Sequence, residues 1–463
     1  MTHDYRASRR RFLASAGALA TGAAAAAASP ALAQGAAQNG PPAGKLPYLI
    51  SRSTDSLMPR GKVPRVVICG GGWGGVTAAK YLRQLVPHLE VVLLERNPVF
   101  FSCPMSNKWL VDVVDTQFLT HDYLGVSEKY GYRFIQTEIL EIEREGKRVI
   151  TAAGAIHYDY LIVAPGIRYN YEAWFGNDRR MAEATRARFP AAYIPSAEHF
   201  HLKNALQSFK GGDLVMTLPP PPQRCPPSPY ERACLIASMF KQKKIPGRIY
   251  ILDHKDGARP IGPGFRSTFE ELYKDIITYV PDARIEEVDP FKRRIRTEAG
   301  DFDFQHAILM APHQAGDLAW KAGLVPRPGA GNPSGGWADV DPLFLHDRTD
   351  KEVFVIGDAV GFVSPQFGFY PKAGHVANRH ARIVAYYISE REAGREPDYR
   401  LPDNLCFMMV NIAPQEGISV QFDYKVNAQG IIEQTQIDYN DRTAATISQD
   451  FGWAQTIYED MFS

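Results

Sequence analysis

The feature that most constrains the fold is a strand–turn–helix–strand unit that begins at residue 65. Residues 65–69 form a short apolar and β-branched run, which is typical of a buried parallel strand. The run leads into the glycine-rich segment 70–75, which contains the pattern Gly-x-Gly-x-x-Gly, and a helical pattern follows to about Leu85. A second apolar strand over 91–94 then ends at Glu95, 20 residues after the last glycine. Strand, turn, helix, strand and acid in this order predict a dinucleotide-binding unit.

Each part of this unit has a physical role in binding a dinucleotide. Gly70, Gly72 and Gly75 permit a tight turn and a close approach of the ligand to the backbone. Trp73 stands in the turn that leads into the helix, whose N-terminus attracts a pyrophosphate. Glu95 supplies a carboxylate for the ribose hydroxyls and disfavours a 2′-phosphate. The unit therefore predicts FAD or NAD rather than NADP.

Segments far downstream favour FAD over NAD. Residues 353–356 form a strand that leads into Gly357 and Asp358, and in FAD enzymes of the glutathione reductase type such an aspartate contacts the ribityl chain or the pyrophosphate. The segment that ends at Gly166 and the similar segment 307–312 resemble the strands that connect the two nucleotide-binding domains of that fold. The predicted fold class is α/β, with two dinucleotide-binding domains of this type. A C-terminal α+β domain is expected to cover the flavin and to form an interface.

The second dinucleotide domain is expected between residues 171 and 305, but its glycine-rich turn is missing. Its first strand is predicted over 214–218 and its second over 249–253. Where the turn should follow the first strand, residues 219–227 instead contain six prolines. Proline has no backbone N–H, so this turn cannot offer the row of amide donors that binds a pyrophosphate. We therefore predict that this domain has no nicotinamide site and that the protein is not an NAD(P)H-dependent reductase.

Composition excludes several classes of function. The formal net charge is +1, which gives no electrostatic basis for binding nucleic acid or an anionic membrane surface. The chain has five cysteines and no Cys-x-x-Cys pair, so we expect no haem on this chain. The histidines form no pattern typical of metal ligands, and no metal is predicted.

The N-terminus has the pattern of an export signal. Residues 8–13 contain three consecutive arginines followed by Phe-Leu, and an Ala- and Gly-rich stretch leads to a small-residue cleavage pattern at 31–33. The arginines indicate the twin-arginine route, with an ordinary signal peptide as the alternative. We expect residues 1–33 to be a twin-arginine signal and residues 34–62 a linker. The mature protein is then expected in the periplasm, without a membrane span.

Several segments resemble those of one family. The nine residues from Arg224 to Arg232 are similar to the Arg-Cys-Pro-Pro-Gly-Pro-Tyr-Glu segment of the flavoprotein subunit of flavocytochrome c sulfide dehydrogenase. Further similar segments are 101–107, 371–374 and 413–420, and the resemblance covers roughly residues 63–463. Sulfide:quinone oxidoreductases are similar more distantly. The resemblance implies an FAD enzyme that oxidises sulfide and passes electrons to a cytochrome c subunit.

The resemblance also implies roles for two cysteines. In the family, the cysteine that matches Cys103 is joined covalently to the flavin, and a buried, unmodified cysteine is the alternative here. The cysteine that matches Cys225 carries the sulfur chemistry together with a second cysteine, and the corresponding position here is Ala338. A disulfide with position 338 is therefore impossible in this chain. Cys225 is left to hold a persulfide or to attack the flavin directly.

The local sequence around these positions indicates further chemistry. Cys225 stands at a helix N-terminus beside Arg224, which predicts a depressed pKa for its thiol. Glu231, in the first turns of the same helix, is a candidate proton acceptor, with a solvated carboxylate as the alternative. Lys372 is a candidate for stabilising the reduced, anionic flavin, with a surface lysine as the alternative. The remaining cysteines are interpreted as packing residues: Cys69, Cys234 and Cys406.

The domains and the function follow from these segments. The FAD-binding domain is predicted at 63–170 and 306–395, the second domain at 171–305, and a C-terminal domain of the flavocytochrome type at 396–463. We predict a periplasmic FAD-dependent dehydrogenase of sulfide or a related reduced sulfur compound, partnered by a cytochrome c subunit or another periplasmic carrier. One alternative is a membrane-docking quinone reductase, which is disfavoured because the tail shows only a short apolar helix. The other is a non-catalytic electron-transfer or redox-sensing flavoprotein.

Overall fold

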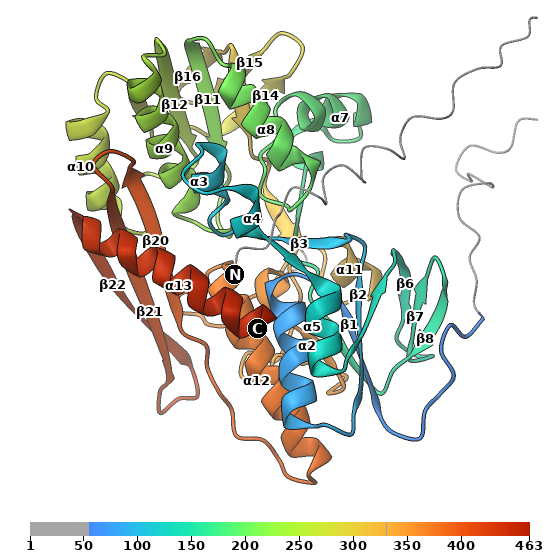
Figure 1. The fold of residues 1–463 in the computed structure, drawn as a ribbon. Helices are drawn as coiled ribbons and strands as arrows, with labels where there is room; N and C mark the ends of the chain where they lie inside the picture. The colour runs from blue at the N-terminus through green and yellow to red at the C-terminus, as the bar shows by residue number, and fades with distance from the viewer. Residues whose placement is uncertain (1–54, 330) are drawn as a thin grey trace, which may run out of the picture. The chain divides into compact units, whose positions relative to one another are not determined.

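The computed structural model describes residues 55–329 and 331–463 (Figure 1). The predicted signal peptide at 1–33 and residues 34–54 of the predicted linker lie outside the described residues. The described part of the linker is attached to a neighbouring strand, because the Leu57 N–H donates to the Ala155 carbonyl at 2.8 Å. Met58 beside it is buried. Residues 57 and 58 are therefore part of the packed structure.

The first sheet is parallel and has the order β19-β9-β1-β2-β5. Its strands are β1 (Arg65–Cys69), β2 (Glu90–Glu95), β5 (Arg133–Gln136), β9 (Tyr160–Val163) and β19 (Val353–Val355). All five residues of β1 are buried, as expected for a central strand of a parallel sheet that is covered on both faces. Helix α2 (Trp73–Leu85) begins directly after the glycine-rich turn. The predicted strand–turn–helix–strand unit thus forms the middle of this sheet.

Helix α12 (Gly374–Glu392) packs along α2, and Figure 1 shows the two side by side. The contact is close because small residues face it: a Cβ on Gly374 would lie 2.9 Å from the Trp73 ring. The other elements of this region are β3 (Val99–Phe101), α3 (Ser106–Leu110), α4 (Thr116–Leu119), β4 (Thr120–Asp122), α5 (Tyr123–Tyr130), β6 (Ile139–Glu143), β7 (Arg148–Thr151), β8 (Gly154–His157) and the 3-10 helix η1 (Gly357–Ala359).

Two short antiparallel strands, β10 (Ile167–Tyr169) and β18 (His313–Ala315), connect the first sheet to a second one. The second sheet is parallel and has the order β13-β12-β11-β17. Its strands are β11 (Gly212–Leu218), β12 (Gly247–Asp253), β13 (Ile277–Val280) and β17 (His306–Leu309). β17 pairs with β11, so the second sheet extends beyond the expected domain boundary at residue 305. The sequence of β17 does not reveal this, because a buried apolar strand looks the same in either sheet.

Helix α9 (Ser228–Lys243) follows β11 after the proline-rich segment and is buried along most of its length. The remaining elements between the two connecting strands are α6 (Glu172–Phe175), α7 (Arg179–Arg188), α8 (Ala197–Ser208), α10 (Gly262–Leu272), β14 (Ile285–Asp289), β15 (Arg294–Thr297) and β16 (Gly300–Asp303), and α11 (Asp317–Lys321) follows β18. The two parallel sheets with their covering helices confirm the predicted α/β class.

The C-terminal region is an antiparallel sheet with a helix against it. Strands β20 (Asn404–Asn411), β21 (Glu416–Val426) and β22 (Ile432–Thr443) precede helix α13 (Ala444–Phe462). The expectation of only a short apolar helix in this tail is wrong, because α13 has 19 residues. Its buried side packs against β20, β21 and α2. Among the described residues, no helix is both long enough and apolar enough to cross a bilayer.

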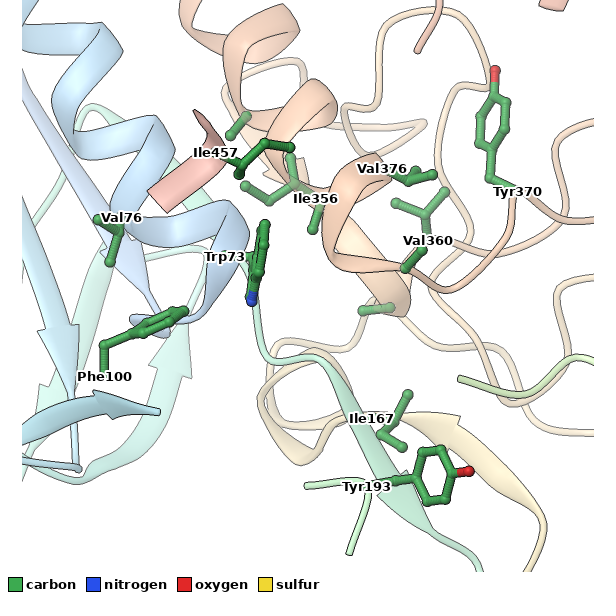
Figure 2. Close-up of a cluster of buried hydrophobic side chains, with 14 of the residues drawn as sticks. Trp73, Val76, Phe100, Ile167, Tyr193, Ile356, Val360, Tyr370, Val376 and Ile457 are labelled. Atoms are coloured by element: carbon green, nitrogen blue, oxygen red, sulfur yellow. The ribbon is translucent and has the colours of Figure 1, made fainter. Parts of the chain in front are cut away.

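The core joins the C-terminal helix to the first sheet. Figure 2 shows Trp73 of α2, Ile356 before η1, Val376 of α12 and Ile457 of α13 as members of one buried cluster. The Trp73 ring stacks on Trp453 of α13 with 5.9 Å between the ring centroids. Aromatic pairs of this kind contribute about 0.5–1.5 kcal/mol beyond the buried area. The last helix of the chain is thus held against the helix that follows the glycine-rich turn.

Candidate functional site

One cavity of about 1200 Å³ collects most of the residues that the sequence singles out. It lies at the carboxyl end of β1 and β2 and extends to the start of α9 and to β20. All predicted site residues except Gly75 line it: Gly70, Gly72, Trp73, Glu95, Cys103, Gly166, Cys225, Glu231, Gly357, Asp358 and Lys372. Positions 219–223 of the proline-rich segment do not line it. A ligand at the carboxyl ends of parallel strands is the usual arrangement in such folds.

The three predicted glycines of the turn meet different constraints. Gly70 has φ +113°, and a Cβ there would lie 2.4 Å from the Ala164 carbonyl oxygen. A Cβ on Gly75 would lie 1.8 Å from the Gly70 carbonyl oxygen, so Gly75 brings α2 close to the turn from behind the cavity. A Cβ on Gly72 would meet nothing within 4 Å. Gly72 lines the cavity, and its missing side chain leaves the backbone open to a ligand.

Glu95 at the end of β2 is held in place by three hydrogen bonds. Its Oε2 accepts from the Gly71 N–H at 2.7 Å, and its Oε1 accepts from the Asn97 N–H and the Asn97 Nδ2 at 2.9 and 2.7 Å. The carboxylate is therefore oriented beside the glycine-rich turn and at the cavity wall. This is where a carboxylate binds the ribose of a dinucleotide.

A flavin dinucleotide fits this donor set. The open backbone at Gly72 and the N-terminus of α2 would hold a pyrophosphate, and Glu95 a ribose. Gly357 has φ +72° and opens η1, which places Asp358 at the cavity wall. When bound, the flavin ring would supply a two-electron acceptor.

Arg224 and Asp358 form an ion pair at the cavity wall. The Arg224 Nε lies 2.5 Å from the Asp358 Oδ2, and a second guanidinium nitrogen donates to the Tyr193 carbonyl at 2.5 Å. A Cβ on Gly166 would lie 2.6 Å from the guanidinium, so glycine at 166 makes room for it. The Arg224 N–H also donates to His313 Nδ1 at 3.0 Å. The guanidinium is therefore paired with Asp358 and the Tyr193 carbonyl rather than with the neighbouring thiol of Cys225.

The predicted depressed pKa of Cys225 is wrong. Burial raises the pKa of this thiol well above its usual range, and Cys406, Glu231 and Cys103 raise it further. The residue has φ +48° and its N–H donates to the Lys372 carbonyl at 2.8 Å, three residues before α9 begins. The helix dipole acts within the first turn, and the cation beside the thiol pairs with Asp358. Cys225 therefore sits in the cavity as a protonated thiol that needs a proton acceptor.

Glu231 belongs to a buried charge network rather than to a solvated surface. Its carboxylate lies 2.8 Å from the Lys108 Nζ, accepts from Asn107 Nδ2 at 2.8 Å and accepts from the Met409 N–H at 3.0 Å. Lys108 also lies 2.8 Å from Asp450 Oδ2 of α13. All three charged side chains are at most 8% exposed. One ammonium is thus shared between two buried carboxylates.

The charges in this network shift one another. Burial alone would lower the pKa of Lys108, but Asp450 and Glu231 overcome that effect and raise it. Burial raises the pKa of Asp450. The sequence analysis does not identify three residues of this network, because a lysine in a short helix and an aspartate in the last helix carry no local signal of a shared partner. These residues are Lys108, Asn107 and Asp450. Asp450 is more than 200 residues from Glu231 along the chain.

Lys372 is buried, which excludes the interpretation as a surface lysine. Its Nζ donates to the Val360 carbonyl and lies 4.4 Å from the centre of the Trp337 ring. Burial lowers the pKa of this lysine to about 7. Ala338, next to Trp337, is fully buried and does not line the cavity.

The five cysteines divide into two groups. Cys69 and Cys234 are fully buried, which confirms that they are packing residues. Cys103 lines the cavity, its Sγ contacts the Tyr193 carbonyl at 3.5 Å, and burial raises its pKa. Cys406 packs against the core, as predicted, but it also lines the cavity. It lies in an apolar strand whose edge faces the site, and the sequence pattern alone does not show that edge. Within the described ranges, no three His, Cys, Asp or Glu side chains are grouped as metal ligands.

Comparisons with known proteins place this site in a family. Residues 200–310 match the model for the central region of the sulfide dehydrogenase (flavocytochrome c) flavoprotein chain, and residues 64–208 match the model for pyridine nucleotide-disulphide oxidoreductases. A segment of 43 residues is 54% identical to the sulfide dehydrogenase flavoprotein chain of Chlorobaculum thiosulfatiphilum and covers 9% of this chain and 90% of that one. The chain belongs to the sulfide dehydrogenase flavoprotein family. Membership in this family supports the assignment of this protein as an FAD-dependent oxidoreductase.

More distant relatives agree with this assignment. The mitochondrial sulfide:quinone oxidoreductase of Mus musculus is 24% identical over 311 residues, which are 63% of this chain and 65% of that one. The matched part of this chain thus spans just under two thirds of the length of the mouse protein. The crystal structure of sulfide:quinone oxidoreductase from Aquifex aeolicus superposes with a TM-score of 0.66 at 17% identity, covering 86% of this chain and 92% of that one. This last similarity shows a shared fold.

Proposed function

We propose that the protein is an FAD-dependent dehydrogenase that oxidises sulfide or a related reduced sulfur compound at Cys225. The observation that carries the proposal is that one cavity contains the dinucleotide-binding turn, Glu95, the Cys225 thiol and the buried carboxylate of Glu231. The family relationship supports the substrate class, since the Chlorobaculum relative is a sulfide dehydrogenase flavoprotein. A sulfur group next to a flavin site is the arrangement that such a reaction needs.

The residues around Cys225 are placed to accept the proton of its thiol. Because the Cys225 pKa is raised, the thiol must lose its proton before it can act as a nucleophile. The negative charge of Glu231 is close enough to Cys225 to raise the pKa of its thiol. The Glu231 carboxylate is also one of the two that share the Lys108 ammonium. The network can accept one proton without leaving an isolated buried charge. The Lys372 carbonyl accepts the Cys225 N–H, and Lys372 lines the same cavity, so its side chain is the candidate group for balancing a negatively charged flavin.

We also propose that Cys103 is the covalent attachment point of the flavin. Its thiol lines the same cavity as Glu95 and Asp358, which supports a position beside the bound dinucleotide. After acid precipitation of the purified protein, we expect the yellow colour to remain in the protein pellet. Cys103→Ala should release the flavin into the supernatant, whereas Cys225→Ala should retain it in the pellet. Flavin in the supernatant of the wild-type protein would contradict covalent attachment.

The proposed setting is the periplasm, with export by the twin-arginine route and a cytochrome c subunit or similar carrier as the electron acceptor. The arginine-rich N-terminal sequence and the flavocytochrome c relative support this setting. The sulfide:quinone oxidoreductase relatives favour quinone as the second candidate acceptor. The helix α13 does not favour quinone docking, because its apolar side is packed against β20 and β21.

An acceptor assay tests this assignment. With sulfide as the donor, we expect rapid reduction of a soluble c-type cytochrome and slow reduction of a short-chain quinone, both followed by absorbance. Heat-inactivated protein is the control for direct reduction of each acceptor by sulfide. Fast reduction of quinone with no reduction of cytochrome would contradict the cytochrome proposal and support the quinone candidate.

A further inference from the structure

Cys406 has the position of a functional sulfur without an assigned role. It is one of only three cysteines that line the cavity in the described part of the chain, together with Cys103 and Cys225. It lies on β20, at the edge that faces the start of α9. The position that holds the second cysteine of the related sequences, Ala338, carries no sulfur and does not line the cavity.

The packing of β20 on α9 sets the position of Cys406 relative to Cys225. β20 packs against α9 and is tied to it by the Met409 N–H, which donates to Glu231 at 3.0 Å. Cys406 is three residues before Met409 on this strand, and Cys225 is three residues before α9 begins. Both cysteines therefore lie toward the same end of the α9–β20 contact and open into the same cavity.

A second set of interactions also links Cys406 to Cys225, through Tyr424, Tyr370 and Lys372. Cys406 acts electrostatically on Tyr424, whose ring packs against Tyr370 with 4.8 Å between the centroids. Tyr370 is two residues before Lys372, and the Lys372 carbonyl accepts the Cys225 N–H at 2.8 Å. After burial itself, Cys406 raises the pKa of Cys225 more than Glu231 or Cys103 does. Coulomb interactions weaken with distance, and of the two other cavity cysteines Cys406 has the stronger electrostatic effect on the Cys225 thiol.

We propose that Cys406 is the redox partner of Cys225 and that the two thiols close a reversible disulfide at the cavity wall. The proposal rests on the proposed function and supplies the second sulfur that position 338 lacks. When the disulfide forms, one S–S bond is made and two electrons and two protons leave. A two-electron oxidant of the flavin class takes up the electrons.

The substrate step then balances without a further oxidant. A hydrosulfide ion attacks the Cys225 sulfur of the disulfide, the bond between the two cysteines breaks, and a persulfide forms on Cys225. Cys406 leaves as a thiolate that carries the electron pair of the broken bond. Burial raises the pKa of Cys406 to about 11, and the Asn404 Nδ2, which donates to the Cys406 Sγ at 3.3 Å, opposes that rise and favours negative charge on the sulfur. A better leaving thiolate speeds this kind of exchange, so the contact directs the attack to Cys225.

The test detects the disulfide itself and requires no sulfide. The full chain with its bound flavin is treated with diamide, a two-electron thiol oxidant, and is then denatured and blocked with N-ethylmaleimide. We expect two fewer blocked thiols than in untreated protein, and a linked peptide that joins Cys225 to Cys406 in the mass spectrum. Dithiothreitol should reverse both changes. The proposal would be overturned if N-ethylmaleimide blocks both Cys225 and Cys406 of the diamide-treated wild-type protein, since both thiols would then have stayed free. A link from Cys225 to a different cysteine would also overturn it.

Matched variants separate the pair from the other cysteines and from the proposed function. Cys406→Ser should lose no thiol on diamide treatment, whereas Cys234→Ala removes a buried thiol outside the cavity and should still lose two. Sulfide should reduce the flavin of Cys406→Ser more slowly than that of the wild type, and an unchanged rate would overturn the role of Cys406. If the linked peptide forms but sulfide does not reduce wild-type flavin, the proposed function fails and the redox pair stands.

Discussion

Gly75→Ala is expected to yield protein that binds no flavin and is strongly destabilised. Alanine normally stabilises a helix by about 1 kcal/mol relative to glycine. Here its Cβ would lie 1.8 Å from the Gly70 carbonyl oxygen, a backbone atom of the turn itself. Relieving such an overlap requires α2 and the turn to separate, which costs about 3 kcal/mol and outweighs the gain in helix propensity. Urea denaturation and the ratio of flavin to protein absorbance measure the two effects.

Gly72→Ala is the matched control, since the same methyl group is added three residues earlier. Gly72 has φ −73° and ψ −166°, an extended conformation that any residue adopts, and its Cβ would meet no atom within 4 Å. The free energy of unfolding of the apoprotein should therefore stay within about 0.5 kcal/mol of the wild type. The methyl group would project into the cavity, so flavin affinity should fall. Equal effects of the two substitutions on unfolding would contradict the assigned geometry of the turn.

Lys108→Met is expected to destabilise the protein by about 3–5 kcal/mol at neutral pH, because it leaves Glu231 and Asp450 buried without their shared counter-charge. Methionine keeps the length of the side chain and removes only the ammonium. Burial already raises the pKa of Asp450, so protonation relieves part of the cost. The difference from the wild type should shrink as the pH falls toward the carboxyl range. Urea denaturation at several pH values measures this difference.

Two variants control for this result. Asp450→Asn in the Lys108→Met background removes one of the two uncompensated carboxylates and should recover part of the lost stability. Lys425→Met removes an ammonium that is 72% exposed and paired with Glu433, and should change stability by less than about 1 kcal/mol. A Lys108→Met protein as stable as the Lys425→Met protein would show that the buried network does not hold α3, α9 and α13 together.

The sequence was sufficient for the first dinucleotide unit because its signal is local. The apolar strand at 65–69, the glycine pattern and Glu95 are close in the chain, and the fold brings them together with little influence from distant residues. Gly166 and Asp358 could also be predicted, since they follow short apolar strands whose ends meet at the same edge of the first sheet. Gly75 is the one predicted residue that supports the turn from behind the cavity rather than lining it.

The rest of the site depends on contacts that no local pattern encodes. The ammonium of Lys108 pairs with carboxylates more than 100 and more than 300 residues away, and Cys406 reaches the cavity only because β20 packs on α9. The error at Cys225 has the same origin. A thiol beside an arginine at a helix start predicts a thiolate, but Asp358, 134 residues further along the chain, pairs with that arginine. Burial then sets the pKa of the thiol.

The most direct test of the central claim is anaerobic reduction of the protein's flavin by sulfide in a stopped-flow spectrometer, with Cys225→Ala as the comparison. We expect rapid bleaching of the wild-type flavin and a rate that falls by about 1000-fold or more in the variant, because the sulfur at which sulfide is oxidised is gone. Cys234→Ala should bleach like the wild type, since its thiol is buried outside the cavity. A wild-type flavin that sulfide leaves oxidised, or a Cys225→Ala flavin that bleaches at the wild-type rate, would contradict the claim that sulfur is oxidised at Cys225.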